Sequence, residues 1–208
     1  MAEQANQTNH VEQWERDYLR DLAKKQLEIA NSDEMLEKEK FWYDHNDYKS
    51  NARPMVTLER GSFNREFEHL WNPKCRSETA RNLEYYFHSN MVQYEYIHDD
   101  VVMPREFAVG IWAGIKPFDI DIETERRIGE THAYKTKYPM KDLEEDFHML
   151  KKSTINCSFE GVANWKKIVE DIIGDIMPAR FTFGPYCGLA ACVGRLMGLE
   201  MMMISMCD

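Results

Sequence analysis

The 208 residues are 43% hydrophobic and 12% aromatic, which supplies enough apolar side chain for one sizeable core and excludes a disordered chain. A formal net charge of -10 argues against a nucleic-acid partner, because binding to a phosphate backbone depends on clustered Lys and Arg. No apolar stretch approaches the ~20 residues of a membrane span, the start is polar, and the 5 scattered cysteines suit reduced thiols, so we expect a cytoplasmic protein without a membrane partner.

The first 50 residues predict two helices. The first of them carries an apolar stripe at helical spacing, made of Trp14, Tyr18, Leu19 and Leu22. Glu34 follows Asn31 by three positions, which resembles a capping box and predicts the start of the second helix. We therefore expect residues 1–50 to form a helical hairpin that precedes the main domain.

Residues 51–208 alternate short apolar runs with amphipathic segments. Arg53-Pro54 disfavours helix, so the apolar run at residues 55–58 predicts a first core strand. A long helix is expected from about Ser77, followed by a second strand at residues 101–103. This order of strand, helix and strand is typical of a parallel sheet.

The second half of the chain continues the pattern. Strict alternation at residues 118–122 predicts a half-buried strand, and Pro139 precedes an expected short helix. A helix at about residues 159–173 should stop at Gly174, and a strand at residues 177–183 should lead through a turn into a helix at residues 189–197. The alternation favours an α/β class with parallel strands.

Motifs that carry chemistry are few. The chain has no nucleophile elbow, phosphate loop or dinucleotide-binding glycine fingerprint, and no two of its 7 histidines have the spacing of a zinc helix. Asp119, Asp121 and Glu123 share one predicted strand face, which we interpret as solvated acids rather than a cation site. Cys187 and Cys192 are expected to point to different faces and to pack as small residues. We therefore expect no metal site within this chain.

Parallel barrels place their reacting residues at the carboxyl ends of strands and in the loops that follow. That rule selects as candidate site residues Glu59, Arg60, Arg105, Glu106, Gly184, Tyr186 and Gly188, of which we interpret all but Glu106 as substrate-binding residues. Each candidate also has an interpretation without a function. The charged residues are then ordinary loop charges, the Gly184-Pro185 turn only connects a strand to a helix, and Tyr186 is a packing residue.

Several blocks, in order along the chain, resemble one protein family. They are Phe41-Trp42 with His45-Asn46-Asp47 before Arg53-Pro54-Met55-Val56, then His98-Asp99-Asp100-Val101-Val102, then Trp165 with Val169 to Pro178, and finally Leu196 to Met203 with Met206-Cys207-Asp208. In these residues the chain resembles the uroporphyrinogen-decarboxylase-like superfamily, which includes tetrapyrrole decarboxylases and corrinoid- or coenzyme-linked methyltransferases on a TIM barrel. The resemblance implies a partial TIM-barrel-like unit at residues 51–208, after the helical extension at residues 1–50.

The resemblance also assigns site residues. The decarboxylases bind substrate carboxylates through an Arg- and Gly-rich segment after the first strand, but here Glu59 stands where a cation is expected and would repel propionates. Their catalytic aspartate corresponds to Asp100 or, by a shifted alignment, to Glu106. True uroporphyrinogen decarboxylation is therefore the least favoured function.

Length limits what the resemblance can supply. An eight-unit barrel requires ~250 residues, so this chain covers the front half and ends before the strands that bind zinc in the methyltransferase relatives. No cofactor is expected within the chain, and corrinoid or zinc is expected only with a C-terminal half. The open strand edges predict a homo-oligomer or a complementing chain.

Three functions follow in order of preference. The first is a shortened protein of the methyltransferase-like branch, handling a small-molecule, tetrapyrrole or corrinoid ligand in methyl transfer when completed. The second is a non-enzymatic interaction module that pairs with a second chain. The third is an active tetrapyrrole decarboxylase.

Overall fold

The computed structural model describes residues 10–59, 64–111, 114–126, 134–142, 144–157, 159–183 and 189–207. The chain divides into two compact units, and each is described by itself. The first consists of Met1–Val109 with Ala163–Phe181, and the second of Gly110–Val162 with Thr182–Asp208. The predicted boundary near residue 50 lies inside the first unit.

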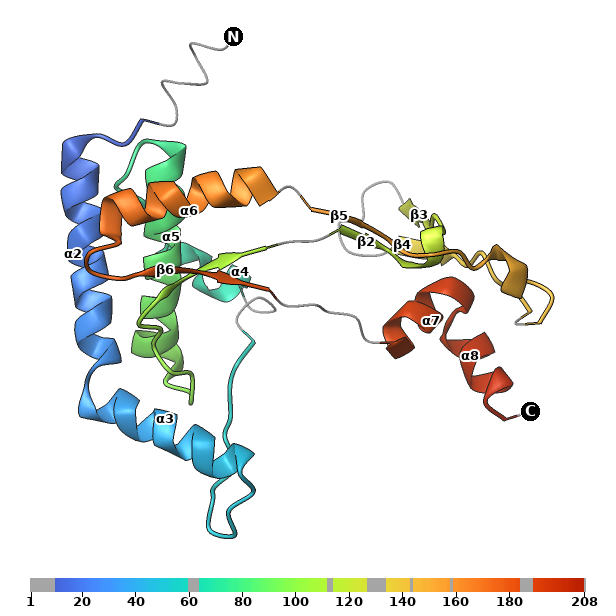
Figure 1. The fold of residues 1–208 in the computed structure, drawn as a ribbon. Helices are drawn as coiled ribbons and strands as arrows, with labels where there is room; N and C mark the ends of the chain where they lie inside the picture. The colour runs from blue at the N-terminus through green and yellow to red at the C-terminus, as the bar shows by residue number, and fades with distance from the viewer. Residues whose placement is uncertain are drawn as a thin grey trace. The chain divides into compact units, whose positions relative to one another are not determined.

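The predicted N-terminal helices are present as α2 (Gln13–Ala30) and α3 (Asp33–Asn46) (Figure 1). Ser32, rather than Asn31, caps α3, and its hydroxyl accepts a hydrogen bond from Met35 N at 3.4 Å. The buried face of α2 differs from the predicted stripe and consists of Glu15, Leu19, Ala23, Gln26 and Ala30. Trp14 is 41% exposed, because the helix turns the polar Glu15 inward in its place.

The long helix predicted from Ser77 is α5 (Glu78–Val92), and it packs against α2 (Figure 1). Ser77 caps it and accepts a hydrogen bond from Ala80 N at 3.2 Å. Leu83, Phe87 and Met91 recur at helical spacing on one face of α5 and are all buried. The helix continues as a π-helical turn, η3 (Gln93–Ile97), which ends where His98 adopts a left-handed conformation with φ 53°. Short helical turns α4 (Asn64–Phe67) and η2 (Glu68–Leu70) precede α5 in the chain.

One parallel strand pair starts in the first unit. Phe107 N donates to Pro178 O at 2.9 Å and Ile111 N donates to Thr182 O at 2.8 Å, so the residue offset stays constant along β1 (Phe107–Gly110) and β6 (Ala179–Thr182). A constant offset identifies parallel strands. Helix α6 (Phe159–Ile173) precedes β6 and places Trp165 edge-on to Phe107, with ring centroids 6.4 Å apart. The predicted helix at residues 159–173 is confirmed.

Helix α2 holds the C-terminal end of α6 through two arginines. Arg16 pairs with Asp171 at 2.6 Å, and Arg20 binds both oxygens of Asp175 at 2.6 Å while donating to Ile172 O at 2.9 Å. Cations are favourable at this end of a helix because its carbonyls are unpaired. These contacts join the N-terminal helical hairpin to helix α6, which precedes strand β6.

Two predicted strands are wrong. Residues 55–58 and 101–103 lie in no helix or strand and belong to no sheet. Backbone N–H groups of Val56 and Leu58 donate instead to the carboxylates of Asp100 and Asp99, at 2.8 and 2.7 Å. These carboxylates accept the hydrogen bonds that the carbonyl groups of a neighbouring strand would accept in a sheet.

The second unit contains small antiparallel sheets and two helices. Strand β2 (Gly114–Lys116) pairs with β5 (Thr154–Asn156), and β3 (Glu123–Arg126) pairs with β4 (Tyr134–Lys137). Helix α7 (Leu189–Met197) confirms the prediction for that range, and α8 (Leu199–Ser205) follows it. The core of the second unit is a cluster of Met140, Leu196 and Met197, and Phe118, Ile120 and Ile122 pack against this cluster.

The predicted sidedness of residues 118–122 is therefore confirmed, but their predicted strand is not. A 3-10 turn, η4 (Pro117–Asp119), occupies the first part, with positive φ at Phe118 and Asp119. The helix expected after Pro139 is reduced to the 3-10 turn η5 (Phe147–Met149), in which Phe147 is 64% exposed. Phe147 therefore buries little apolar surface that could stabilise a longer helix.

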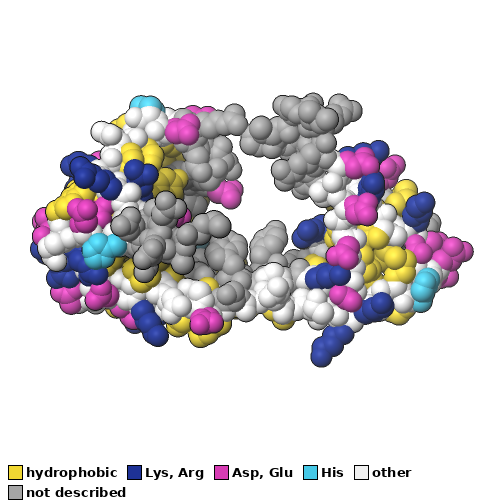
Figure 2. All heavy atoms as spheres, turned by 90° about the horizontal axis from the view of Figure 1, so that it is seen from above, with side chains coloured by type: hydrophobic (Ala, Val, Ile, Leu, Met, Phe, Trp, Pro, Cys, Tyr) yellow, Lys and Arg dark blue, Asp and Glu magenta, His cyan; other side chains and the backbone are white. Residues whose placement is uncertain are grey.

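The mixture of helices and strands is compatible with the broad α/β class, with one parallel pair, β1 and β6, and two antiparallel pairs among the described strands. The described strands form three two-stranded sheets, so no barrel is present among them. Basic and acidic side chains are interspersed on the face shown in Figure 2. None of the described helices is both long enough and apolar enough to cross a membrane.

Gly174 follows the last residue of α6, and its lack of a side chain lets its backbone pack closely against Glu170 of that helix. A Cβ at this position would lie 2.5 Å from Glu170 O, so we expect Gly174→Ala to lower the free energy of unfolding by about 1–3 kcal/mol. Gly194 in α7 is the matched control, because a Cβ there meets nothing within 4 Å and alanine favours helix. Thermal unfolding followed by circular dichroism checks both, and a Gly174→Ala variant as stable as wild type would contradict the close contact.

Candidate functional site

Asp100 is the centre of a compact polar junction in the first unit. Arg53 binds it with both guanidinium nitrogens, at 2.6 and 2.9 Å, and Val56 N donates to it at 2.8 Å. Its backbone is also held, since Asp100 N donates to Val56 O at 2.9 Å and Trp42 Nε1 donates to Asp100 O at 2.7 Å. The Arg-Pro segment, α3 and the end of the π-helical turn meet at this residue.

The environment favours the ionised form of Asp100. Hydrogen bonds from Arg53 and then from Val56 N lower the pKa of the carboxyl to about 2, although burial opposes them. A carboxylate with that pKa holds no proton at neutral pH. It can accept hydrogen bonds or stabilise a positive charge, but it cannot act as a general acid in this arrangement.

Asp99 performs a parallel role beside it. Its Oδ2 accepts from Leu58 N at 2.7 Å and from Gln93 Nε2 at 2.6 Å, and its Oδ1 accepts from Val101 N at 3.1 Å. Gln93 belongs to the π-helical turn η3, and such turns recur at functional sites. The two neighbouring aspartates therefore fasten the segment around Leu58 to the end of α5.

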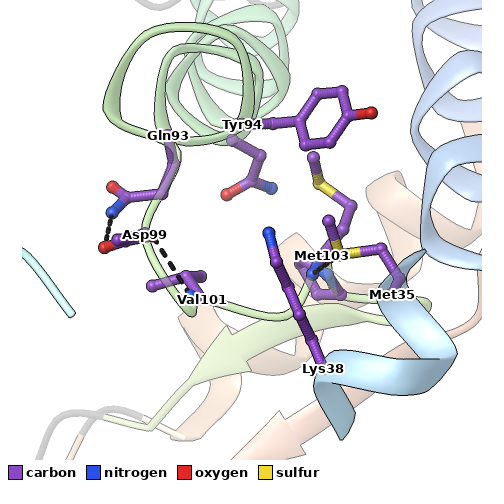
Figure 3. A pocket seen from close by; sticks show the side chains of 9 residues that line it. Met35, Lys38, Gln93, Tyr94, Asp99, Val101 and Met103 are labelled. Atoms are coloured by element: carbon purple, nitrogen blue, oxygen red, sulfur yellow. Dashed lines mark hydrogen bonds between the residues drawn. The ribbon is translucent and has the colours of Figure 1, made fainter. Parts of the chain in front are cut away.

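A pocket opens next to this junction (Figure 3). Helix α3 contributes Met35 and Lys38, the α5 to η3 region contributes Gln93 and Tyr94, and the segment after His98 contributes Asp99 and Met103. The space between the atoms amounts to about 280 Å³ when open solvent is included, but its enclosed part has room for only about one water molecule. Lys38 extends from α3 into the middle of this space (Figure 3).

The other described site candidates do not lie beside the carboxylates of Asp99 and Asp100. Arg105 pairs with Glu39 of α3 at 2.9 Å, and Glu106 pairs with Arg180 of β6 at 2.9 Å. Both precede Phe107, so they lie at the amino end of β1 rather than at the carboxyl end of a strand as expected. Glu59 is exposed. The candidates Arg60, Gly184, Tyr186 and Gly188, like Cys187, lie outside the described residues.

The acidic face at residues 119–123 is occupied by lysines. Lys116 lies 3.3 Å from Asp119 and 3.0 Å from Asp121, and Lys137 lies 3.2 Å from Glu123. Within the described ranges, no three His, Cys, Asp or Glu side chains are grouped in a way that could hold a metal ion. The described cysteines Cys75, Cys157, Cys192 and Cys207 are free thiols.

Sequence reasoning missed two buried acids that organise the loop before α5. Glu15 of α2 is 1% exposed and accepts from Arg76 N at 2.6 Å and Ser77 N at 3.0 Å. Glu84 of α5 is 3% exposed and accepts from Lys74 N at 2.8 Å and Cys75 N at 2.9 Å. Burial, together with Glu84, raises the pKa of the Cys75 thiol to about 12, so that thiol is unreactive.

Lys38 and Gln93 were also missed. Lys38 stands in a run of alternating charges on α3 that looks like a solvated face, and nothing in the residues around Gln93 signals a π-helical turn. Comparison of the chain with protein-family models, with curated proteins and with solved structures finds no match.

Proposed function

We propose that the chain is the front part of a uroporphyrinogen-decarboxylase-like barrel of the methyltransferase-like branch, which takes part in corrinoid- or tetrapyrrole-related methyl transfer once further strands complete it. The observation that supports this most is the parallel unit of β1, α6 and β6, with Phe107 N bonded to Pro178 O and Ile111 N bonded to Thr182 O. Such barrels are built from a strand, a crossover helix and a parallel strand; here β2 to β5 also stand between β1 and α6 in the chain. In this proposal the protein works in the cytoplasm.

The direction of these strands selects among the candidate residues. Ligands of parallel α/β folds bind at the carboxyl ends of strands. Gly184, Tyr186 and Gly188 follow the carboxyl end of β6 in the chain, whereas Arg105 and Glu106 lie at the amino end of β1. The proposal therefore gives substrate contacts to the segment after β6, and the catalytic role of Asp100 or Glu106 stays a prediction.

Binding of a macrocycle tests the proposal. Hydroxocobalamin and coproporphyrin are titrated against the full chain, with binding followed by visible absorbance. We expect Tyr186→Ala to weaken binding at least tenfold, and Tyr48→Ala to leave it unchanged because Tyr48 is 93% exposed. A folded chain, with or without self-association, that binds neither macrocycle would contradict the proposal.

A second candidate is an interaction module without catalysis, and a specific surface favours it. Helix α8 and the residue after it present large apolar side chains to solvent, namely Leu199 at 67%, Met203 at 63%, Ile204 at 49% and Met206 at 79% exposed. The β1 and β6 pair also has no third strand among the described residues. Unpaired strands and exposed apolar side chains favour association with another copy or a second chain. Light scattering after size exclusion checks this, and a strictly monomeric species would count against it.

A further inference from the structure

Helix α8 and the two residues after it are rich in sulfur. Five of the seven residues from Met201 to Cys207 bear a sulfur atom. Met202 lies on the inner side of this segment, where it packs against the core cluster of the second unit. Met203 is 63% exposed, Met206 is 79% exposed, and Cys207 is an exposed free thiol. Three sulfur-bearing side chains are therefore accessible to a ligand at the end of α8.

The backbone places these three side chains within one helical turn. Met206 N donates to Met203 O at 3.2 Å. Cys207 N donates to Ile204 O at 2.9 Å, so the helical path continues to Cys207. Met206 and Cys207 follow Met203 by three and four residues, spacings at which helix positions share a face with Cβ atoms about 5–6 Å apart. Because the methionine side chain is long and flexible, both thioethers can converge on one point beside the thiol.

Two thioethers and one thiol form a ligand set for a soft metal ion. Thioether and thiolate sulfur are the ligands that suit Cu(I) in proteins. Zinc is bound instead by thiolate, imidazole and carboxylate ligands, usually four of them, and hard cations require oxygen ligands. The sequence expectation of no metal site concerned histidine, cysteine and carboxylate ligands, and the thioethers of α8 add a different ligand type.

We propose that Met203, Met206 and Cys207 bind one Cu(I) ion through two thioether sulfurs and one thiolate. The thiolate is the form of cysteine that binds metals, so binding releases the thiol proton of Cys207 to solvent. The ion enters and stays as Cu(I), and no oxidant or reductant is required. The site lies in the second unit and uses none of the residues of the methyl-transfer proposal.

Competition with a coloured Cu(I) chelator tests the site. The full chain, reduced and kept free of oxygen, is titrated into the Cu(I) complex of bicinchoninate, and loss of the visible absorbance of that complex measures transfer of copper to the protein. We expect Cys207→Ser to weaken Cu(I) binding by about tenfold or more, because the thiolate is a direct ligand. Cys157→Ser removes another exposed free thiol and should leave the affinity of the site unchanged.

Leucine substitutions separate metal binding from association through the apolar surface of α8. Met203→Leu and Met206→Leu remove a sulfur but keep an apolar side chain of similar volume, so each should weaken Cu(I) binding by about tenfold while light scattering shows unchanged self-association. Met201→Leu is the matched control. Met201 lies on the same helix and is 37% exposed, but positions two residues apart do not share a helix face, so its replacement should leave Cu(I) binding unchanged.

Three results would overturn the proposal. The first is a wild-type protein that withdraws no more copper from the chelator than Cys207→Ser does. The second is unchanged Cu(I) affinity in both Met203→Leu and Met206→Leu, which would leave the thiol as the single ligand. The third is displacement of the bound Cu(I) by an equal amount of Zn(II).

Discussion

Replacing Glu15 by glutamine is expected to lower the free energy of unfolding by about 3 kcal/mol, because hydrogen bonds to a buried charged group contribute about 1.5–3 kcal/mol each. The carboxylate accepts from Glu12 N at 2.9 Å, Arg76 N at 2.6 Å and Ser77 N at 3.0 Å, so each of its oxygens faces a backbone donor. The amide of glutamine would direct N–H groups at one of these donors. Urea unfolding at neutral pH measures the loss.

Glu28→Gln is the control, since Glu28 lies exposed on the same helix and its replacement should change stability by less than about 0.5 kcal/mol. The pH dependence provides a second check. Burial raises the pKa of Glu15, but the bonds from Ser77, Arg76 and Glu12 outweigh it, and the pKa lies below the usual 4.5. The stabilisation is therefore complete above about pH 4.5 and is lost as the pH falls, so a difference between wild type and Glu15→Gln that does not shrink in acid would contradict this account.

The helices were predictable because their signals are local. Ser77 as a cap, the period of Leu83, Phe87 and Met91, and the apolar face of α6 lie within single segments of the chain. The buried side of α2 was not predictable in the same way. Glu15 replaces Trp14 on that face because the backbone at Arg76 and Ser77, 61 and 62 residues away in sequence, offers it N–H groups.

The strands failed for a related reason. Residues 55–58 have the composition of a core strand, but the aspartates at 99 and 100 satisfy their N–H groups and no neighbouring strand is required. The true strand, β1, begins at Phe107, four residues after the predicted one ends. That displacement moves Arg105 and Glu106 from the expected carboxyl end of a strand to its amino end.

Of the candidate site, only the aspartate pair at its centre could be predicted from the sequence. The pair of aspartates at residues 99 and 100 stands out in sequence, and both organise the junction beside the pocket. Lys38 and Gln93 depend on how α3 and the π-helical turn approach that pair, which is a tertiary property without a local signal.

Replacing Asp100 by asparagine is expected to cost about 1–2 kcal/mol of stability at neutral pH, a range that allows for solvent screening of Arg53, which is 45% exposed. The loss arises because asparagine keeps one acceptor for Val56 N but loses the two-pronged ion pair. The folded pKa of about 2 lies below the usual 3.8, so this stabilisation is present above about pH 4 and disappears as the pH falls towards 2. Urea unfolding of wild type and Asp100→Asn between pH 7 and pH 2.5 checks it.

A double-mutant cycle with Arg53→Met assigns the loss to the pair. We expect the two single variants to be similarly destabilised and the double variant to be little worse than either, whereas Asp21→Asn, in a pair whose side chains are 75% and 62% exposed, should have almost no effect. Strictly additive losses would show that Asp100 and Arg53 act independently. The same variants separate structure from catalysis: if Asp100 is also catalytic, Asp100→Asn should lose more activity than Arg53→Met at equal folded fraction, because only the first removes the carboxylate.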